Sequence, residues 1–388
     1  MKPDQIHIPT AIYFGRDIWQ ESLKEIDTML DGSVMIVTTG RSLARLGYIT
    51  DLRKKLEECP KVEQVVIFDK VSANPKLSEA KKGIEIAKEC KVDIVVGFGG
   101  GSAIDLAKAV AMGAGTEVPI EEYLYGGREP EEGTLPVIAI PTTAGTGSEL
   151  SKAAILTDEI KKIKAGIRGR YLFPRAAIVD SIFTESMPFH ITMETGFDVI
   201  AHAMESYISK AASQYTQMQS EYALKIAGRM LPRLAADLGD TQARRQMSYV
   251  SMMMGINLGN ASTGLPHRLQ YPLGAYTDTS HGWGLAALYP AWIAYEFEYN
   301  CERVEHLISI LIQSPVQGKQ NCIHAMRQFI TLLKLPASLR AANIDRRMMQ
   351  DMIDTVTGNL LNDPASQEPD IVQKIYESAW EETYECRQ

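Results

Sequence analysis

Four residues in the C-terminal half have the types and the spacing of a metal site. Asp198 and His202 lie four residues apart in "TGFDVIAHAMESYIS", so an α-helix would place both on one face, one turn apart. His267 and His281 follow in "PHRLQYPLGAYTDTSHG", and Gly264 and Pro266 before His267 predict a helix start there. One carboxylate and three imidazoles suit a borderline divalent cation such as Fe²⁺ or Zn²⁺. Such a cation would polarise a carbonyl group or lower the pKa of a bound alcohol.

Asp198 and His202 on their own have a simpler interpretation, a hydrogen-bonded Asp–His pair. Phe197 and Ala201 beside them are typical of a helix face that packs into a core. A buried carboxylate needs partners, and a cation would satisfy both residues. With the two later histidines, the set of four favours the metal site. A fifth coordination position would accept a substrate oxygen.

The stretch "VVGFGGGSAIDLAKAV" (95–110) predicts a buried strand, a glycine turn and a helix. Glycines let the backbone approach an anion closely, and the N–H groups at a helix start point towards it. We therefore expect a nucleotide pyrophosphate at Gly100, Gly101 and Ser102. The alternative is a plain strand-to-helix turn in which Ser102 and Asp105 form a capping pair.

A second polar turn, "IPTTAGTGSEL" (140–150), follows another predicted strand. Its threonines Thr142, Thr143 and Thr146 offer hydroxyl groups beside small residues. No Gly-Lys-Ser/Thr ends the turn, so it is not a P-loop. It is interpreted as a second wall of the nucleotide site, or as an ordinary polar turn.

The elements that must position these residues differ between the two halves. Short runs rich in Val and Ile alternate with helical stretches in the first half, which indicates βαβ units and a parallel, Rossmann-like sheet. The predicted strands are 33–39, 64–70, 93–100, 136–143 and 175–180. After about residue 183 only helical periodicity remains. We predict a dinucleotide-binding α/β domain over 1–182 and a helical metal- and substrate-binding domain over 183–388.

In their order and spacing these motifs resemble the iron-containing (group III) alcohol dehydrogenase family. The resemblance rests on "PTAIYFG" (9–15), "NP" (74–75), "GGGSAIDLAK" (99–108), "PTTAGTGSE" (141–149) and the two histidine motifs, and "GLAALYPAW" (284–292) looks like the butanol dehydrogenase branch. The resemblance implies the architecture shared with dehydroquinate synthase and hydride transfer between a nicotinamide and a metal-bound aldehyde or alcohol.

The resemblance also implies roles for individual residues and for the assembly. It assigns the metal, Fe²⁺ or else Zn²⁺ or Mn²⁺, to Asp198, His202, His267 and His281. A homodimer is expected from the family and from general frequencies of oligomers. The NAD(P)H contacts fall on Asn74, Gly100, Gly101, Ser102, Thr142, Thr143, Thr146 and Lys164.

Two positions depart from the family pattern. Many members have another histidine four residues after the third metal ligand, and this chain has Tyr271 there. The proton route would then use the tyrosine hydroxyl, the cofactor ribose or water. Arg268 and Gln270 stand where small or apolar residues are common. Arg268 is either a surface salt-bridge residue or a pocket residue that binds an anionic substrate such as a sulfonate or phosphonate aldehyde.

The residues after the second predicted strand bear on the choice between NAD and NADP. An acidic residue at this point often binds the ribose 2′-hydroxyl of NAD. Here "VMIVTTGRS" ends in Thr39 and Arg41 with no carboxylate. This leaves room for a 2′-phosphate paired with Arg41 and favours NADP over NAD. Alternatively, Arg41 is a solvated residue at a helix start.

Composition excludes several classes of protein. The net charge is −8 with no basic run, which argues against nucleic acid or an anionic membrane as partner. We expect no membrane span, no signal peptide and reduced cysteines, as in a cytoplasmic protein. Three functions remain, in order of preference: a metal-dependent alcohol dehydrogenase, a cyclase of the dehydroquinate-synthase type, and a non-catalytic nucleotide or metal sensor.

Overall fold

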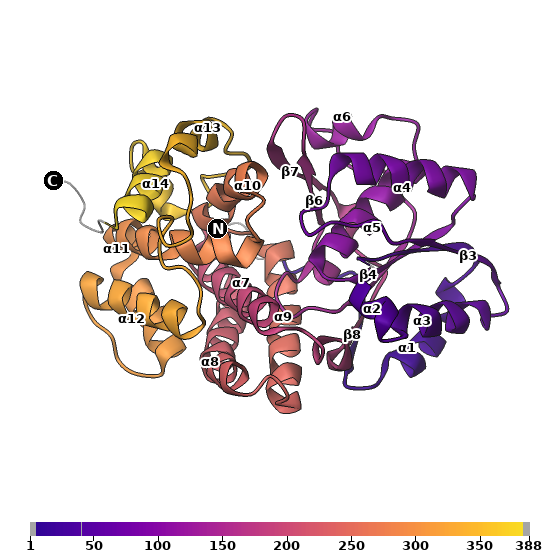
Figure 1. Ribbon diagram of the computed structural model, residues 1–388, viewed down its shortest axis with the longest axis horizontal. Helices are drawn as coiled ribbons and strands as arrows, with labels where there is room; N and C mark the ends of the chain where they lie inside the picture. Colours follow the sequence, from indigo (N-terminus) through magenta and orange to yellow (C-terminus); the bar gives the residue numbers. More distant parts are fainter. Residues whose placement is uncertain (1–4, 40, 383–388) are drawn as a thin grey trace. The chain divides into compact units, whose positions relative to one another are not determined.

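The computed structural model describes residues 5–39 and 41–382 of the 388-residue chain. This part forms two compact units, each built from its own core (Figure 1). The α/β unit comprises residues 8–143 and 147–186. The helical unit comprises residues 144–146, the chain from 187 onward and the few described residues before 8. No helix in the described ranges combines the length and the apolar composition that crossing a bilayer requires.

A six-stranded parallel sheet forms the centre of the α/β unit. In spatial order its strands are β1 (Ala11–Gly15), β8 (Ala176–Asp180), β5 (Val137–Pro141), β4 (Ile94–Gly99), β2 (Gly32–Val37) and β3 (Val62–Phe68). The five strands predicted from the sequence are confirmed, with ends that differ by one or two residues. β1 was missed, because its five residues show no clear alternation.

Helices cover both faces of this sheet, as the continuous apolar runs of its strands require. Along β2, Val34 and Ile36 pack with α1 (Trp19–Glu25) and α3 (Tyr48–Glu57). Met35 and Val37 point to the opposite face and pack with helices α4 and α5. The remaining helices of the unit are α2 (Arg41–Arg45), α4 (Leu77–Glu89), α5 (Gly101–Ala114) and α6 (Ile120–Leu124), with 3₁₀ turns at Asp27–Met29, Ser148–Leu150, Arg170–Leu172 and Ser181–Thr184.

The α/β unit also contains a two-stranded antiparallel sheet that the sequence analysis missed. It consists of β6 (Ala153–Asp158) and β7 (Ile163–Arg168), joined by a short charged loop. Two six-residue strands carry a weak periodic signal, because the alternation is broken by a run of small residues in β6 and by Gly166 in β7.

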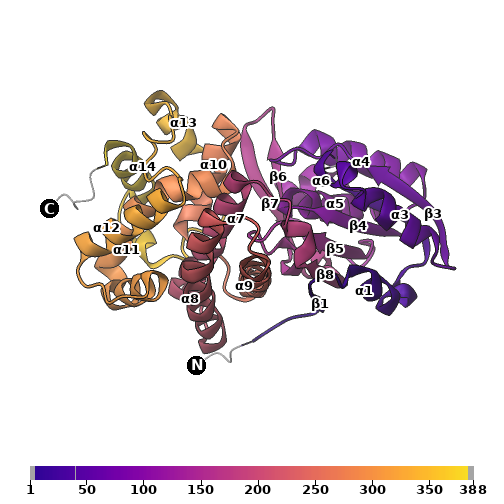
Figure 2. The same cartoon turned by 60° about the horizontal axis from the view of Figure 1, so that its bottom comes forward.

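The second unit is built from helices, as predicted, and its described residues contain no strand. Helix α7 packs against α8, α9 and α11, and this arrangement is visible in Figure 2. Gly264 caps α10 and Pro266 lies in its first turn, so the predicted helix start is confirmed. The bounds are α7 (Phe189–Ile208), α8 (Gln214–Ala236), α9 (Thr241–Asn260), α10 (Leu265–Thr277), α11 (His281–Ile312), α12 (Lys319–Leu332), α13 (Met349–Asp354) and α14 (Ile371–Glu381), with 3₁₀ turns at Arg346–Met348 and Pro364–Gln367.

Candidate metal centre

Three helices of the helical unit bring Asp198 and the three predicted histidines together. Asp198 and His202 lie one turn apart on α7, and both side chains are buried. Their neighbours Phe197 and Ala201 are fully buried in the core, which fixes the orientation of the polar face. His267 comes from the first turn of α10 and His281 is the first residue of α11. The predicted convergence of these four side chains is therefore observed.

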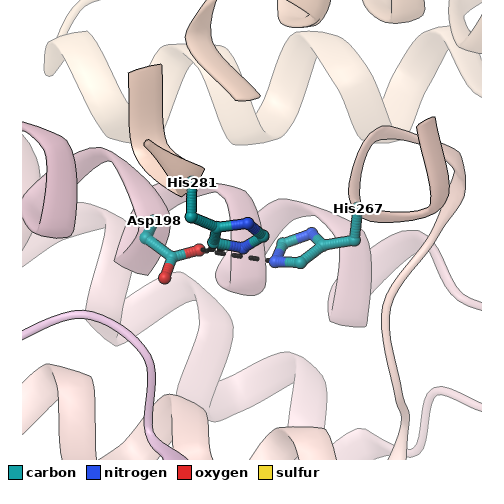
Figure 3. A group of neighbouring side chains, drawn as sticks. All are labelled: Asp198, His267 and His281. Carbon is teal, nitrogen blue, oxygen red and sulfur yellow. Dashed lines mark ion pairs between the residues drawn. The ribbon is translucent and has the colours of Figure 1, made fainter. Parts of the chain in front are cut away.

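One oxygen atom lies at the centre of this cluster. Oδ1 of Asp198 is 3.4 Å from Nε2 of His267 and 3.5 Å from Nε2 of both His202 and His281. The rings of His202 and His267 stack with centroids 4.6 Å apart. Figure 3 shows that His267 and His281 point their rings towards the same carboxylate. Three imidazole nitrogens thus converge on a single buried carboxylate oxygen.

The cluster fits a divalent cation. Atoms bound about 2.1 Å from a tetrahedral ion lie about 3.4 Å from one another. The observed separations from Asp198 Oδ1 match this value. Asp198 Oδ1 and His267 Nε2 are buried and have no hydrogen-bond partner among the described residues. Because buried polar atoms are normally satisfied, these two atoms indicate a ligand from outside the chain.

The four predicted ligands do not contribute equally to this geometry. Ligand atoms of Asp198, His267 and His281 all lie within 4.8 Å of one another, which makes these three residues the compact part of the cluster. His202 approaches the shared oxygen of Asp198 at the same distance as His281. His202 lies one turn further along α7 than Asp198, and its Nε2 is a fourth ligand nitrogen beside that triad.

Two outer residues, Glu205 and Gln270, contact the far side of the His267 and His281 imidazoles and orient them. Nδ1 of His267 lies 2.7 Å from Oε1 of the buried Glu205, and Nδ1 of His281 lies 2.6 Å from Oε1 of Gln270. A proton on each Nδ1 leaves the Nε2 lone pair pointing towards Asp198, which is the tautomer that a metal ligand needs. Glu205 is itself held by the backbone N–H of Gly264 at 2.7 Å.

Sequence reasoning missed both outer residues. Glu205 is seven residues after Asp198 and three after His202, so all three share one face of α7. This spacing is a signal that could have identified it. Gln270 was noted only as unusual for the family. Nothing in the sequence indicated that its side chain would reach His281, because the two residues belong to different helices.

The electrostatics of the cluster favour a cation. Burial alone would raise the pKa of Asp198, but the surrounding imidazoles outweigh it and hold the pKa of this carboxyl below its usual range. Burial lowers the pKa of His202. Burial also opposes charge on His267, yet the carboxylates of Glu205 and Asp198 raise its pKa to about 10. The negative charge of the two carboxylates therefore attracts positive charge to the centre of the cluster.

Arg268 and Tyr271 lie on α10 next to the metal cluster. Arg268 is only 4% exposed and forms no salt bridge with a described residue, so the surface salt-bridge interpretation is wrong. Its Nη1 donates to the hydroxyl of the buried Tyr271 at 3.3 Å. Tyr271 follows His267 by one helical turn and therefore shares its face.

The glycine turn lies at the carboxyl end of a central strand, as predicted. Gly99 ends β4, Gly100 caps α5 and Gly101 is the first residue of that helix. A Cβ at Gly100 would lie 3.2 Å from Thr143, so the turn has little space for any side chain. The capping-pair interpretation is wrong, since α5 has no side-chain cap and Asp105 instead accepts hydrogen bonds from Ser148 and the Ile155 amide.

Several predicted cofactor residues surround that turn within the α/β unit. Ser102 Oγ donates to the carbonyl of Ala73, next to Asn74. Lys164 Nζ donates to Oδ1 of Asn74 at 3.0 Å, and both side chains are buried. The amide of Thr142 donates to the carbonyl of Gly99 at 2.9 Å.

The other predicted cofactor residues are placed as follows. Thr39 follows β2 and is half-buried, and the Oγ1 of Thr39 would be 3.7 Å from a Cβ at Gly99. Thr146 belongs to the helical unit. Arg41 begins α2, but its side chain lies outside the described residues.

Two family models match most of the chain. The model of the iron-containing alcohol dehydrogenase matches residues 9–181, and the model of the C-terminal region of the Fe-containing alcohol dehydrogenase family matches residues 192–380. The chain belongs to the iron-containing alcohol dehydrogenase family. It is therefore an oxidoreductase of the NAD(P)-dependent alcohol dehydrogenase type, as the sequence motifs predicted.

Individual relatives of this iron-type dehydrogenase cover nearly its whole length. The NAD-dependent methanol dehydrogenase of Bacillus methanolicus is 30% identical over 84% of both chains. The NADH-dependent butanol dehydrogenase A of Thermotoga maritima has 27% identity and a TM-score of 0.89 over 98% of this chain and 99% of the other. The sulfoacetaldehyde reductase of Bifidobacterium kashiwanohense in complex with NAD⁺ has 26% identity and a TM-score of 0.85, with the same coverage.

Proposed function

We propose that this iron-type dehydrogenase reduces a small aldehyde to the alcohol with NADH or NADPH, and that a divalent cation in the helical unit activates the carbonyl group. The observation that carries the proposal is the approach of three imidazole nitrogens to one buried, unsatisfied oxygen of Asp198. Fe²⁺ is the preferred ion, with Zn²⁺ and Mn²⁺ as alternatives of similar ligand preference.

The roles of the metal-site residues follow from their contacts. Asp198, His202, His267 and His281 hold the cation, which when bound supplies a Lewis acid that polarises the carbonyl group. Glu205 and Gln270 keep His267 and His281 in the required tautomer. The fully buried neighbours of Asp198 limit water around the site and strengthen its electrostatic interactions.

The cofactor is proposed to bind at the glycine turn of the α/β unit. Gly100 caps α5, and the N–H groups of Gly100, Gly101 and Ser102 at this helix start would hold a pyrophosphate. The names of the three relatives cited above mention NAD, whereas the absence of a carboxylate after β2 favours NADP, so both cofactors belong in the test. Further contacts are proposed for Thr39, Arg41, Asn74, Thr142, Thr143, Thr146 and Lys164.

Tyr271 is the proposed protein group in the proton route. A bound reduced nicotinamide would supply the hydride for the carbonyl carbon, and the carbonyl oxygen would need a proton from another group. The Tyr271 hydroxyl accepts a hydrogen bond from Arg268, and a phenol hydroxyl is also a proton donor. The cofactor ribose and water are the other possible donors.

The substrate is proposed to be a small aldehyde, either uncharged or carrying an anion of the sulfoacetaldehyde or phosphonoacetaldehyde type. One relative is named a methanol dehydrogenase and another a sulfoacetaldehyde reductase, so the names of the relatives include both kinds. A homodimer, expected from the sequence, stays a prediction.

The test is a panel of aldehydes with NADH and NADPH, run on protein loaded with Fe²⁺, Zn²⁺ or Mn²⁺. We expect stoichiometric consumption of the reduced cofactor, lost on chelation and restored by the ion. A cyclase of the dehydroquinate-synthase type would show no net consumption, because it recycles its NAD. Full activity after chelation and dialysis would refute the role of the cation, and absence of turnover with every aldehyde would refute the reductase.

A further inference from the structure

Arg268 carries a buried positive charge that the described chain leaves uncompensated. No carboxylate oxygen of a described residue lies within 4.0 Å of its guanidinium. Among the described residues, its two terminal nitrogens donate hydrogen bonds only to the hydroxyls of Tyr271 and Ser262, each at 3.3 Å. Nε is buried and has no hydrogen-bond partner in the same part of the chain. A charged group in this state is costly unless another molecule supplies an acceptor.

A second buried arginine in the same unit shows how the fold satisfies such a group. Arg244 is 1% exposed, and its nitrogens donate to the carbonyls of Leu238 and Met187 at 3.1 Å and to the hydroxyl of Thr192 at 2.7 Å. The helical unit thus satisfies a structural arginine with its own acceptors. Arg268 lacks such acceptors, which points to a function other than packing.

The backbone of Gly358 packs directly against the Arg268 side chain. Gly358 has a φ of +93°, and a Cβ at this position would lie 2.9 Å from Cδ and 3.1 Å from Nε of Arg268. Any side chain there would collide with Arg268 and strain the backbone, so the close approach requires glycine. On the other side of the guanidinium, Ser262 is exposed, so the group lies just below the surface of its unit.

The guanidinium also lies beside the face of α10 that carries the metal ligand. His267 and Tyr271 are one helical turn apart on that face, and Arg268 reaches the Tyr271 hydroxyl. A molecule whose oxygen is held at the metal cluster therefore has a fixed cation close by, on the same helix.

We infer that Arg268 binds the anionic group of the substrate, so that the enzyme prefers small aldehydes bearing a carboxylate, sulfonate or phosphonate. The inference rests on the proposed reductase function and selects one substrate class within it. The planar guanidinium offers parallel N–H donors that match the oxygens of these anions. Nε supplies one donor that no described residue uses, and the hydroxyls of Tyr271 and Ser262 are weak competitors for the others.

Turnover experiments compare anionic aldehydes with uncharged ones of similar length. The anionic set is sulfoacetaldehyde, phosphonoacetaldehyde and succinic semialdehyde, and the uncharged set is propionaldehyde and butyraldehyde. For the wild type, kcat/KM should be highest for one of the anionic compounds. Arg268→Gln should lower the ratio of anionic to uncharged kcat/KM about 10- to 100-fold, the equivalent of one charge-assisted hydrogen bond or pair.

Two further variants separate a specific contact from a general effect of charge. Arg268→Lys keeps the charge but loses the planar donor pair, so its ratio should fall between wild type and Arg268→Gln. Arg229→Gln removes a positive charge from an exposed side chain that contacts Gln313, and its ratio should equal that of the wild type. An equal fall of the ratio in Arg229→Gln and Arg268→Gln would overturn the inference.

A measurement of equilibrium binding tests the inference even if no turnover is seen. Calorimetry with metal-loaded protein and reduced cofactor should show ethanesulfonate binding at least about tenfold more weakly to Arg268→Gln than to wild type. Gly358→Ala retains the arginine, but its Cβ would collide with Cδ and displace the guanidinium, so it should weaken binding in the same direction. Equal affinities in all three proteins would contradict a role for Arg268, even if aldehydes are reduced. If no aldehyde is reduced but ethanesulfonate still binds in a way that depends on Arg268, only the proposed reductase function is refuted.

Discussion

Two buried charged clusters, one in each unit, differ in how they are satisfied. In the α/β unit, Lys108 donates to the carbonyls of Ser148, Ser151 and Ala153 at 2.6 to 2.9 Å. In the helical unit, Asp198 has only the three imidazoles, and its Oδ1 has no hydrogen-bond partner among the described residues. Lys108 is surrounded by acceptors from its own chain, whereas the Asp198 cluster leaves atoms facing one another with a gap suited to an ion.

The difference separates a structural role from a ligand-binding role. Burial lowers the pKa of Lys108 to about 8, against the opposing effect of Asp105 and Glu149, yet its three carbonyl contacts connect α5 to the turn that precedes β6. These contacts of Lys108 stabilise the fold. The Asp198 cluster is fully stabilised only when a cation is bound, so its role is to bind that cation.

The largest expected effect comes from removing a metal ligand. Asp198→Ala or His267→Ala should reduce metal affinity by more than about 100-fold, the upper end of what losing an outer partner costs, and aldehyde reduction should fall at least as much. Metal affinity is measured by competition with a chelator. His306→Gln, at an exposed histidine that contacts Glu221, is the control. Wild-type metal content in both alanine variants would contradict the assignment.

Lys108→Met should give the opposite pattern. The substitution removes the positive charge near Asp105 and Glu149 and leaves three buried carbonyls without their donor, so the free energy of unfolding should fall by about 3 to 5 kcal/mol. Metal affinity should stay unchanged, because the lysine belongs to the other unit. Thermal unfolding and metal titration measure the two effects. If Lys108→Met lost the metal but kept the wild-type free energy of unfolding, Lys108 would have the binding role and not the structural one.

Glu205→Gln should have an intermediate effect on metal binding. The amide oxygen still accepts from His267 Nδ1, but the negative charge beside the imidazole is lost. Metal affinity should decrease about 10-fold and the melting temperature of the metal-loaded protein should decrease with it. The same chelator competition gives the result. An affinity equal to that of wild type would remove Glu205 from the metal centre.

A third buried cluster, in which Glu296 and Asp363 share a hydrogen bond near the start of α10, gives an effect that depends on pH. Burial and the Asp363 carboxylate raise the pKa of Glu296 above its usual 4.5. The protonated form is therefore favoured in the fold, and its stabilising contribution is complete at low pH and is lost as pH rises above about 4.5.

Glu296→Gln removes this titration and keeps a donor to Asp363. Relative to wild type, the variant should gain about 1 kcal/mol of stability for each pH unit between pH 6 and 8. Thermal unfolding at three pH values tests this difference. A difference that does not change with pH would show that Glu296 is ionised in the fold.

The sequence predicted those parts of the molecule that depend on local pattern. The five central strands and the start of α10 follow from apolar runs, a glycine and a proline. The candidate metal ligands were selected by residue type, with helical spacing as support for Asp198 and His202, and their side chains do cluster. Strand β1 was missed because it is a short edge strand that pairs with the distant β8. The hairpin β6–β7 was missed because small residues break the alternation of its two short strands.

Contacts between elements were predicted less well than the elements themselves. Gln270 reaches His281 across two helices, and Arg268 proved to be buried rather than on the surface. Helical spacing places these residues on a face of α10, but it does not say what covers that face. Only the packing of α10 against its neighbours decides it.

The central claim is that Asp198 and the three histidines bind one divalent cation. Anomalous diffraction from crystals of metal-loaded protein, collected on both sides of the absorption edge of that metal, tests it most directly. We predict a single strong peak about 2.0 to 2.3 Å from Asp198 Oδ1 and from Nε2 of His202, His267 and His281. A stoichiometrically loaded crystal with its peak elsewhere, and none within about 3 Å of that oxygen, would contradict the account.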